Sequence, residues 1–137
     1  MNKNRPQGDT AEAVAALYYM NLGYVVSKPQ NHSPYYDLLV DTGECILRVE
    51  CKSSRYARRG GFEVQVCTSG GNRSWNGLVK TISASKTDVV FILTADGNYY
   101  EFPPHKLDGS TKILVKPELP EHRGRLMGLF NALRVET

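Results

Sequence analysis

The stretch that decides the fold consists of residues 35–40 (YYDLLV) and residues 45–52 (CILRVECK), separated by the sequence DTGE at 41–44. Two runs rich in apolar residues on either side of a Thr-Gly turn predict a β-hairpin. Side chains alternate between the faces of a strand, so Glu50 and Lys52 lie on the same face. The other face of the second strand is apolar, which predicts that the hairpin belongs to a buried sheet.

Charged residues gather on the polar face of this hairpin. With a turn centred on 42–43, Asp37 lies opposite Arg48 and diagonal to Glu50, and diagonal neighbours are roughly 7–8 Å apart. Carboxylates that lose hydration repel each other, and a hard divalent cation with oxygen ligands relieves that cost. Mg²⁺ retains water molecules, one of which can attack a phosphate, and Lys52 can orient or deprotonate that water. The spacing therefore suits phosphodiester hydrolysis.

At these residues the sequence resembles the PD-(D/E)xK nuclease superfamily. Asp37 matches the aspartate of the motif, Glu50-Cys51-Lys52 matches (D/E)xK, and Glu12 matches the acidic residue of the first helix. Within the superfamily the pattern is most similar to group I intron-associated homing endonucleases, with archaeal-type Holliday junction resolvases as close relatives. One departure is the proline, Pro34, which stands three residues before Asp37 rather than next to it.

The resemblance implies a set of catalytic residues. Asp37, Glu50 and the backbone carbonyl of Cys51 would bind Mg²⁺, for which Mn²⁺ is a substitute. Lys52 would position the attacking water. Glu12 would complete the site or bind a second metal.

The resemblance also implies a restriction-endonuclease-like α/β fold, a central mixed β-sheet flanked by helices, in one domain over residues 1–137. The expected activity is that of a metal-dependent endonuclease that hydrolyses double-stranded or branched DNA, as homing endonucleases do. A Holliday junction resolvase of the same fold is one alternative, and a non-catalytic DNA-binding or assembly module is another. One active site cuts one strand, so a homodimer or homotetramer is expected.

The candidate catalytic residues also have structural interpretations. Glu12 follows Asp9 by three residues, which is the spacing of a helix-capping box with Asp9 as the N-cap. Asp37 begins a strand and could serve as a turn residue. Glu50 and Lys52 could form a charge pattern on a solvated sheet face.

The positive charge of the chain is concentrated in its middle. The net charge is +3 overall, whereas residues 48–80 hold seven basic and two acidic residues, a net of +5. Arg55, Arg58 and Arg59 lie in a predicted loop after the catalytic strand, where they are expected to contact DNA phosphates unless the loop is simply solvated. Further candidates for DNA contact are Arg73, Trp75 and Lys80. Trp75 could equally be a core anchor.

The remaining sequence predicts further elements around the hairpin. Strands are expected at 24–27, 62–67, 88–93, 98–102 and 112–115, and helices from Asp9 onward, at 78–86 and at 123–133. The run at 88–93 is apolar, which predicts a strand buried on both faces. Gln65 is a candidate for lining the active site, or else an ordinary exposed glutamine of its strand.

Several classes of protein are excluded by the sequence. No apolar run approaches the roughly 18 residues that span a membrane, and the N-terminal residues lack the apolar segment of a secretory signal. The odd number of cysteines, Cys45, Cys51 and Cys67, predicts free thiols in a cytoplasmic protein. The three histidines are too far apart for zinc-ligand spacing. Cys51 is expected to face the core, which argues against thiol catalysis.

Overall fold

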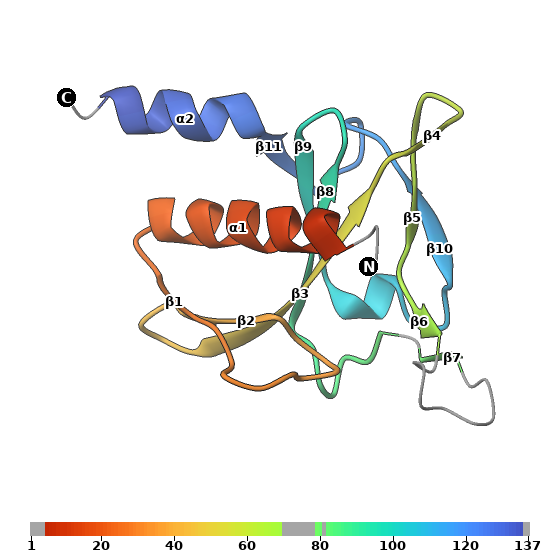
Figure 1. Ribbon diagram of the computed structural model, residues 1–137, viewed down its shortest axis with the longest axis horizontal. Coiled ribbons are helices and arrows are strands. Elements are labelled where there is room, and N and C mark those ends of the chain that lie inside the picture. Colours follow the sequence, from red (N-terminus) through yellow and green to blue (C-terminus); the bar gives the residue numbers. More distant parts are fainter. Residues whose placement is uncertain (1–4, 70–78, 81, 136–137) are drawn as a thin grey trace.

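A six-stranded sheet forms the centre of the molecule (Figure 1). The computed structural model describes residues 5–69, 79–80 and 82–135. From edge to edge the sheet contains β1 (Val25–Ser27), β2 (Leu38–Asp41), β3 (Ile46–Ser54), β8 (Val89–Thr94), β9 (Asn98–Phe102) and β11 (His122–Arg125). The pair β3–β8 is parallel and the other pairs are antiparallel. The expected α/β fold with a central mixed sheet and flanking helices is confirmed.

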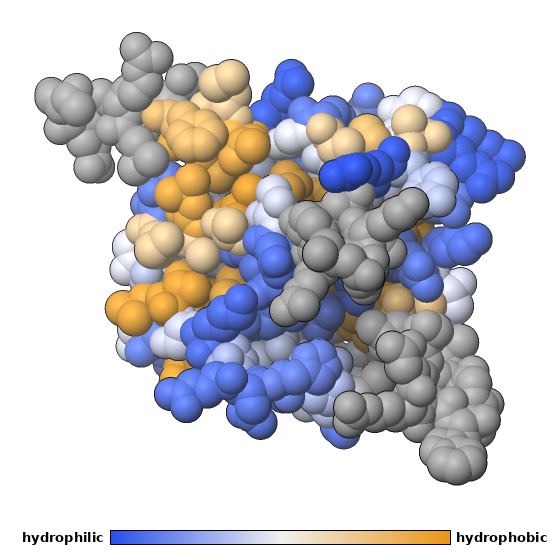
Figure 2. Space-filling view, in the orientation of Figure 1, coloured by the Kyte–Doolittle hydropathy of each residue, from blue (hydrophilic) through white to orange (hydrophobic). Residues whose placement is uncertain are grey.

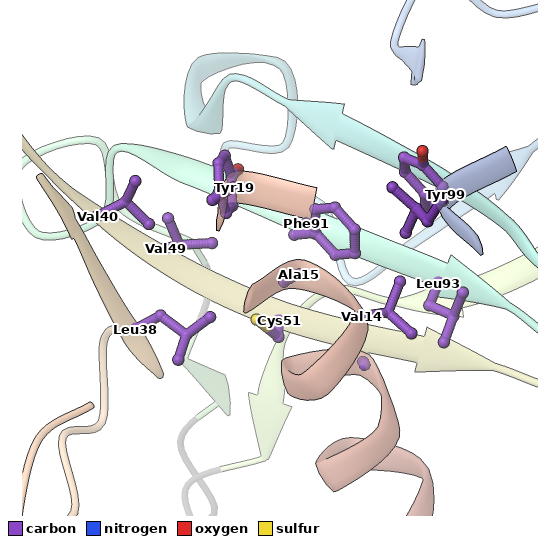
Figure 3. Packing of buried hydrophobic residues seen from close by; sticks show 12 residues of the cluster. Val14, Ala15, Tyr19, Leu38, Val40, Val49, Cys51, Phe91, Leu93 and Tyr99 are labelled. Carbon is purple, nitrogen blue, oxygen red and sulfur yellow. The ribbon is translucent and has the colours of Figure 1, made fainter. Parts of the chain in front are cut away.

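Two helices, α1 (Arg5–Asn21) and α2 (Leu126–Val135), lie on one face of this sheet (Figure 1). The buried side chains of α1 recur every three or four residues, as in an amphipathic helix. Figure 3 shows this core, which includes Val14, Ala15, Tyr19, Leu38, Val40, Val49, Cys51, Phe91, Leu93 and Tyr99. Val49 and Cys51 thus point toward α1, as the alternation of β3 predicts.

A second sheet covers the other face. Its order is β10 (Lys112–Val115), β5 (Gly61–Gln65) and β4 (Tyr56–Arg58). A second core lies between the sheets and includes Val64, Val90 and Ile92, whereas Phe91 and Leu93 of the same strand β8 face α1. The prediction that this strand is buried on both faces is therefore confirmed. The remaining elements are β6 (Thr68–Ser69), β7 (Val79–Lys80) and the 3₁₀ helix η1 (Pro104–Lys106).

The β2–β3 hairpin turns one residue later in the chain than the sequence predicts. Leu39 pairs with Arg48, whereas a turn centred on 42–43 would place Asp37 at that position. The backbones of Thr42 and Cys45 close a four-residue turn, in which the Thr42 hydroxyl also accepts a hydrogen bond from the Cys45 N–H. The predicted register is therefore wrong by two residues, because hydrogen bonds to the Thr42 hydroxyl stabilise a turn centred on Gly43 and Glu44.

The first helix starts earlier than its capping signal predicts. It begins at Arg5, so Asp9 and Glu12 lie inside the helix and do not form a capping box at its start. Ala11 and Val14 pack on the sheet and stabilise the helix as a whole. Tertiary packing of an apolar face contributes more to a helix in a protein than local preference does. The capping role considered for Glu12 is therefore wrong.

The two other predicted helices also need correction. The described residues of 78–86 form β7 and a single turn in which the Ser83 carbonyl accepts the N–H groups of Lys86 and Thr87. The helix predicted over 123–133 begins only at Leu126, because β11 pairs with β9 up to that point. Gly124 lies in this strand with φ 156°, and a Cβ there would come within 2.8 Å of the Tyr99 hydroxyl.

Candidate active site

Asp37 lies immediately before β2, at the edge of β3. Its backbone N–H donates to the carbonyl of Val49 (2.8 Å), and its Oδ2 accepts the backbone N–H of Cys51 (2.7 Å). The regular β2–β3 register ends at the pair Leu38–Val49, and Asp37, one residue before it, bonds to the carbonyl of the same Val49. The Asp37 carboxylate is thus held beside the part of β3 that carries Glu50.

The backbone of Cys51 faces the same edge. The N–H and C=O groups of successive strand residues point to alternate sides, and those of one residue point to the same side. In β3, the Arg48 carbonyl accepts from Asp88 next to β8, and the Val49 carbonyl accepts from Asp37 on the β2 side. By the same alternation the Cys51 carbonyl lies on the side of Asp37, where its N–H already donates to that carboxylate.

Glu50 and Lys52 lie on the face of β3 opposite α1. They are in register with Val90 and Ile92, which belong to the second core. The Lys52 Nζ is 3.4 Å from the Glu50 Oε1, and the two side chains are only 15% and 13% exposed. The alternative of a solvated charge pattern is therefore wrong, since both charges are largely buried and paired.

Glu12 reaches the same region from α1. Its Oε1 forms an ion pair with the Nζ of Lys28 at 3.0 Å, and its side chain is 19% exposed. Because β2 begins only at Leu38, the edge of β3 beside Asp37 is open to groups from both faces of the sheet. Glu12 lies on the face covered by α1 and Lys52 on the opposite face, and the charges of both affect the pKa of the Asp37 carboxyl.

Burial raises the pKa of the Asp37 carboxyl above its ordinary value. The N–H of Cys51 acts in the opposite direction, the negative charge of Glu12 raises this pKa further, and the charge of Lys52 lowers it. The net direction is upward, so the negative charge on Asp37 is incompletely compensated by its neighbours. A cation bound at this carboxylate would relieve that cost.

A pocket of about 250 Å³ opens beside these residues. Its lining includes Glu12, Asp37 and several residues of the segment between β1 and β2, among them Lys28 and His32. The sequence interpretation missed both basic residues as members of the site. The signal available was their place in the polar loop directly upstream of Asp37, although which of its residues face the pocket depends on the folded chain.

In the described part of the chain, no three carboxylate, imidazole or thiol side chains come close enough together to share a metal ion. Glu12 is paired with Lys28, and Glu50 with Lys52. The oxygen donors present at the β3 edge are the carboxylates of Asp37 and Glu50 together with the Cys51 carbonyl. This set of hard oxygen donors, with one under-compensated carboxylate, fits a magnesium ion that keeps several water ligands.

Arg48 lies outside this cluster. Its backbone N–H, Nε and Nη2 all donate to the Asp88 carboxylate, at 2.7, 2.9 and 3.0 Å. This bond pattern lowers the pKa of Asp88. The expected approach of Arg48 to Asp37 is thus wrong, since the register places it two positions away.

The basic residues after β3 lie on a hairpin, not in the predicted loop. Arg55, Arg58 and Arg59 are exposed, and β4 pairs with β5 across a turn at Arg59 and Gly60, whose φ angles are 48° and 80°. Two successive residues with left-handed φ angles are typical of a type I′ turn. Arg58 also forms an ion pair with Glu63 at 2.7 Å.

The other candidates make no contact with Asp37 among the described residues, or lie outside the described structure. Gln65 is exposed at the end of β5, with its amide 3.9 Å from the sulfur of Cys67. The backbone of Lys80 pairs with Thr68 in the small β6–β7 sheet. Arg73 and Trp75 fall outside the described residues. No helix in the described parts of the chain is long and apolar enough to cross a membrane.

The family model of the PD-(D/E)XK endonuclease matches residues 2–126 of the chain. The chain therefore belongs to the PD-(D/E)XK endonuclease family, and it is a nuclease by class. The resemblance seen at the motif residues is confirmed. No curated protein sequence matches the chain.

Solved structures show the same fold. A bacterial homing endonuclease, I-Ssp6803I, has a TM-score of 0.73 and 21% sequence identity to this chain, with 99% of each chain covered. At this identity the likeness is one of fold. The structure of MepB has a TM-score of 0.42 and 15% identity over 82% of each chain, which is too low to bear on the site.

Proposed function

We propose that this protein is a Mg²⁺-dependent DNA endonuclease of the homing-endonuclease type. The observation that carries the proposal is the carboxylate of Asp37, fixed by the Cys51 N–H beside the buried Glu50–Lys52 pair. Two carboxylates, a backbone carbonyl and a lysine at one sheet edge supply the groups needed to hydrolyse a phosphodiester bond. Burial and the charge of Glu12 raise the pKa of the Asp37 carboxyl, and a cation bound there would offset both effects.

Asp37, Glu50 and the backbone carbonyl of Cys51 would hold the metal, with Mn²⁺ as a substitute. Bound Mg²⁺ supplies a water of lowered pKa and neutralises charge that develops on the phosphate. Glu50 is available for this role once its ion pair with Lys52 loosens. Glu12 would complete the site or hold a second ion after release from Lys28.

Lys52 has the position of a residue that handles the attacking water. Its ammonium is largely buried next to Glu50, so its charge is directed into the site rather than screened by solvent. There it would orient the water or hold its proton at Nζ. Gln65, exposed at the end of β5, is retained as a candidate at the margin of the site.

We further propose that the β4–β5 hairpin contacts the DNA backbone. Arg55, Arg58 and Arg59 are exposed and directly follow the strand that carries Glu50 and Lys52. A DNA strand bound at the site would therefore extend past these arginines. Each neutralised phosphate releases counterions, which favours binding at low salt. Arg73, Trp75 and Lys80 remain candidates for further contacts on the basis of the sequence.

Cleavage of both strands of a duplex requires two such sites, so we propose a homodimer or homotetramer. Exposed apolar side chains are available for self-association on α2, where Met127 and Phe130 are 69% and 50% exposed. Figure 2 shows hydrophobic surface over α2 and the neighbouring α1. Burial of such side chains between copies would be favourable.

The test is cleavage in Mg²⁺ of a linear duplex beside a four-way junction of matched sequence. Cleavage of the duplex, abolished by Lys52→Ala but retained by Lys112→Ala, supports the proposal. Lys112 is a matched control, since it pairs with Glu63 at 3.5 Å on the second sheet. Selective junction cleavage would instead assign the resolvase activity, and DNA binding without cleavage in Mg²⁺ or Mn²⁺ would assign a binding module.

A further inference from the structure

The segment that joins β1 to β2 forms one wall of the pocket at Asp37. Six consecutive residues of this segment, from 28 to 33, line the pocket together with Glu12 and Asp37. Figure 2 shows hydrophilic side chains over this part of the molecule, below α1. The resemblance to nucleases accounts for the carboxylates but not for these residues.

Both ends of the segment are anchored. At its start, Lys28 pairs with Glu12 of α1 at 3.0 Å. Near its end, the Tyr35 carbonyl accepts the Thr87 hydroxyl at 2.6 Å, and the Tyr35 ring lies 4.2 Å below the ammonium of Lys86. The segment is thus held to α1 on one side and to the turn before β8 on the other.

The tip of the segment, residues 30–32, is conformationally restricted, and its side chains are exposed. Pro29 and Pro34 flank the tip, and each fixes its own φ, which lowers the entropy lost when the segment is ordered. Gln30, Asn31 and His32 between them are exposed. Within the described residues, the amides of Gln30 and Asn31 make no hydrogen bond. The tip therefore presents preorganised donors and acceptors at the rim of the catalytic pocket.

We propose that Gln30 and Asn31 contact base edges next to the scissile phosphate, with His32 beside them, so that this tip sets the sequence preference at the cut. The inference rests on the proposed endonuclease function. Asn and Gln amides pair in bidentate fashion with the N6 and N7 atoms of adenine in the major groove. Phosphate contacts position a protein on DNA but carry no sequence information, so the arginines of the β4–β5 hairpin cannot serve this purpose.

The tip and the Asp37 carboxylate share one pocket. A phosphate bound at Asp37 lies at the pocket that the tip also lines. The bases that the tip reaches are therefore those flanking the cut. His32 is near enough to Asp37 for its charge to lower the pKa of that carboxyl. We expect a preference for adenine-containing base pairs at one or two positions beside the cut.

The experiment compares the wild type, a Gln30→Ala/Asn31→Ala double variant and an Asn21→Ala control on a duplex with randomised base pairs around the cut. Asn21 is a matched control because it is an exposed amide at the end of α1, outside the pocket lining. Sequencing of cleaved products gives the preference at each position. The wild type and the control should favour adenine beside the cut by roughly 5- to 140-fold, and the double variant should fall to near onefold.

Two outcomes overturn the inference while leaving the proposed function intact: a wild type that cleaves without preference there, or a double variant with an unchanged preference. If the wild type cleaves no DNA, the proposed function fails. The inference is then tested by enrichment of the same randomised duplex on the bound protein, and equal enrichment by the wild type and the double variant overturns it. Matching thermal unfolding of all three proteins excludes a folding defect.

Discussion

The carboxylate of Asp37 accepts a hydrogen bond of 2.7 Å from the backbone N–H of Cys51. This bond continues the β2–β3 ladder past the first residue of β2, with a side chain in place of a strand carbonyl. The sheet itself therefore sets the direction of the carboxylate. It also means that the geometry and the charge of Asp37 can be separated by substitution.

Asp37→Asn should keep the hydrogen bond and lose the charge, whereas Asp37→Ala should lose both. We expect both variants to cleave at least about 100-fold more slowly, because the proposed metal ligand is lost. Only Asp37→Ala should lower the free energy of unfolding, by about 1–3 kcal/mol, since the Cys51 N–H loses its acceptor. Single-turnover cleavage and urea unfolding measure the two effects. Glu44→Gln, which neutralises an exposed carboxylate of the same hairpin, is the control and should change neither.

The raised pKa of Asp37 predicts a pH dependence of stability. The folded state holds this proton more tightly than the unfolded state, so the contribution of Asp37 is fully present below its unfolded pKa of 3.8 and is lost as the pH rises through the raised folded pKa. Relative to the wild type, Asp37→Asn should thus become more stable as the pH increases from about 4 upward. Urea unfolding across this range without divalent metal checks it. A constant difference between the two proteins would contradict the sign of the shift.

Mg²⁺ should stabilise the wild type against thermal unfolding, because it binds the folded site and not the unfolded chain. The shift in the unfolding temperature should be much smaller in Glu50→Gln and Asp37→Asn, which each remove a charged ligand. Differential scanning calorimetry with and without Mg²⁺ measures the effect. An equal shift in all three proteins would place the ion elsewhere.

A substitution at Arg59 should affect DNA binding without lowering the stability of the fold. It has a left-handed φ of 48°, a conformation that glycine adopts without the steric cost borne by other residues. Arg59→Gly should therefore fold at least as stably as the wild type, with a gain of up to about 1 kcal/mol. Its DNA affinity should fall, and the slope of log K against log salt should decrease by about 1. An unchanged slope would show that Arg59 makes no phosphate contact.

Phe130→Asp should shift the protein toward a smaller species if the exposed side chains of α2 join copies of the chain. Sedimentation equilibrium at several concentrations measures the change. Ile46→Asp is a comparison in which an equally prominent apolar side chain, 61% exposed at the start of β3, is replaced. The same mass for the wild type and Phe130→Asp would exclude α2 from the interface.

Much of the architecture follows from local patterns in the sequence. The period of two along β3 separates Val49 and Cys51 from Glu50 and Lys52, and the structure keeps these pairs on opposite faces. The apolar run of β8 could only be accommodated between two covering layers. These features are predictable because they depend on side-chain alternation and burial, which each segment carries by itself.

The sequence by itself determined which residue types stand at the sheet edge and on which face of β3 each lies. Only the tertiary structure decided how they meet. The turn at Gly43 and Glu44 moved Asp37 from the position opposite Arg48 to the end of the β2–β3 ladder, where it contacts Val49 and Cys51. Asp88, forty residues away, took Arg48 as its partner. The pairing of Lys28 with Glu12 and the pocket they share also arise from packing between distant segments. The physical reason is that the position of a turn and the pairing of distant charges depend on hydrogen bonds and charges that become neighbours only after the chain has folded.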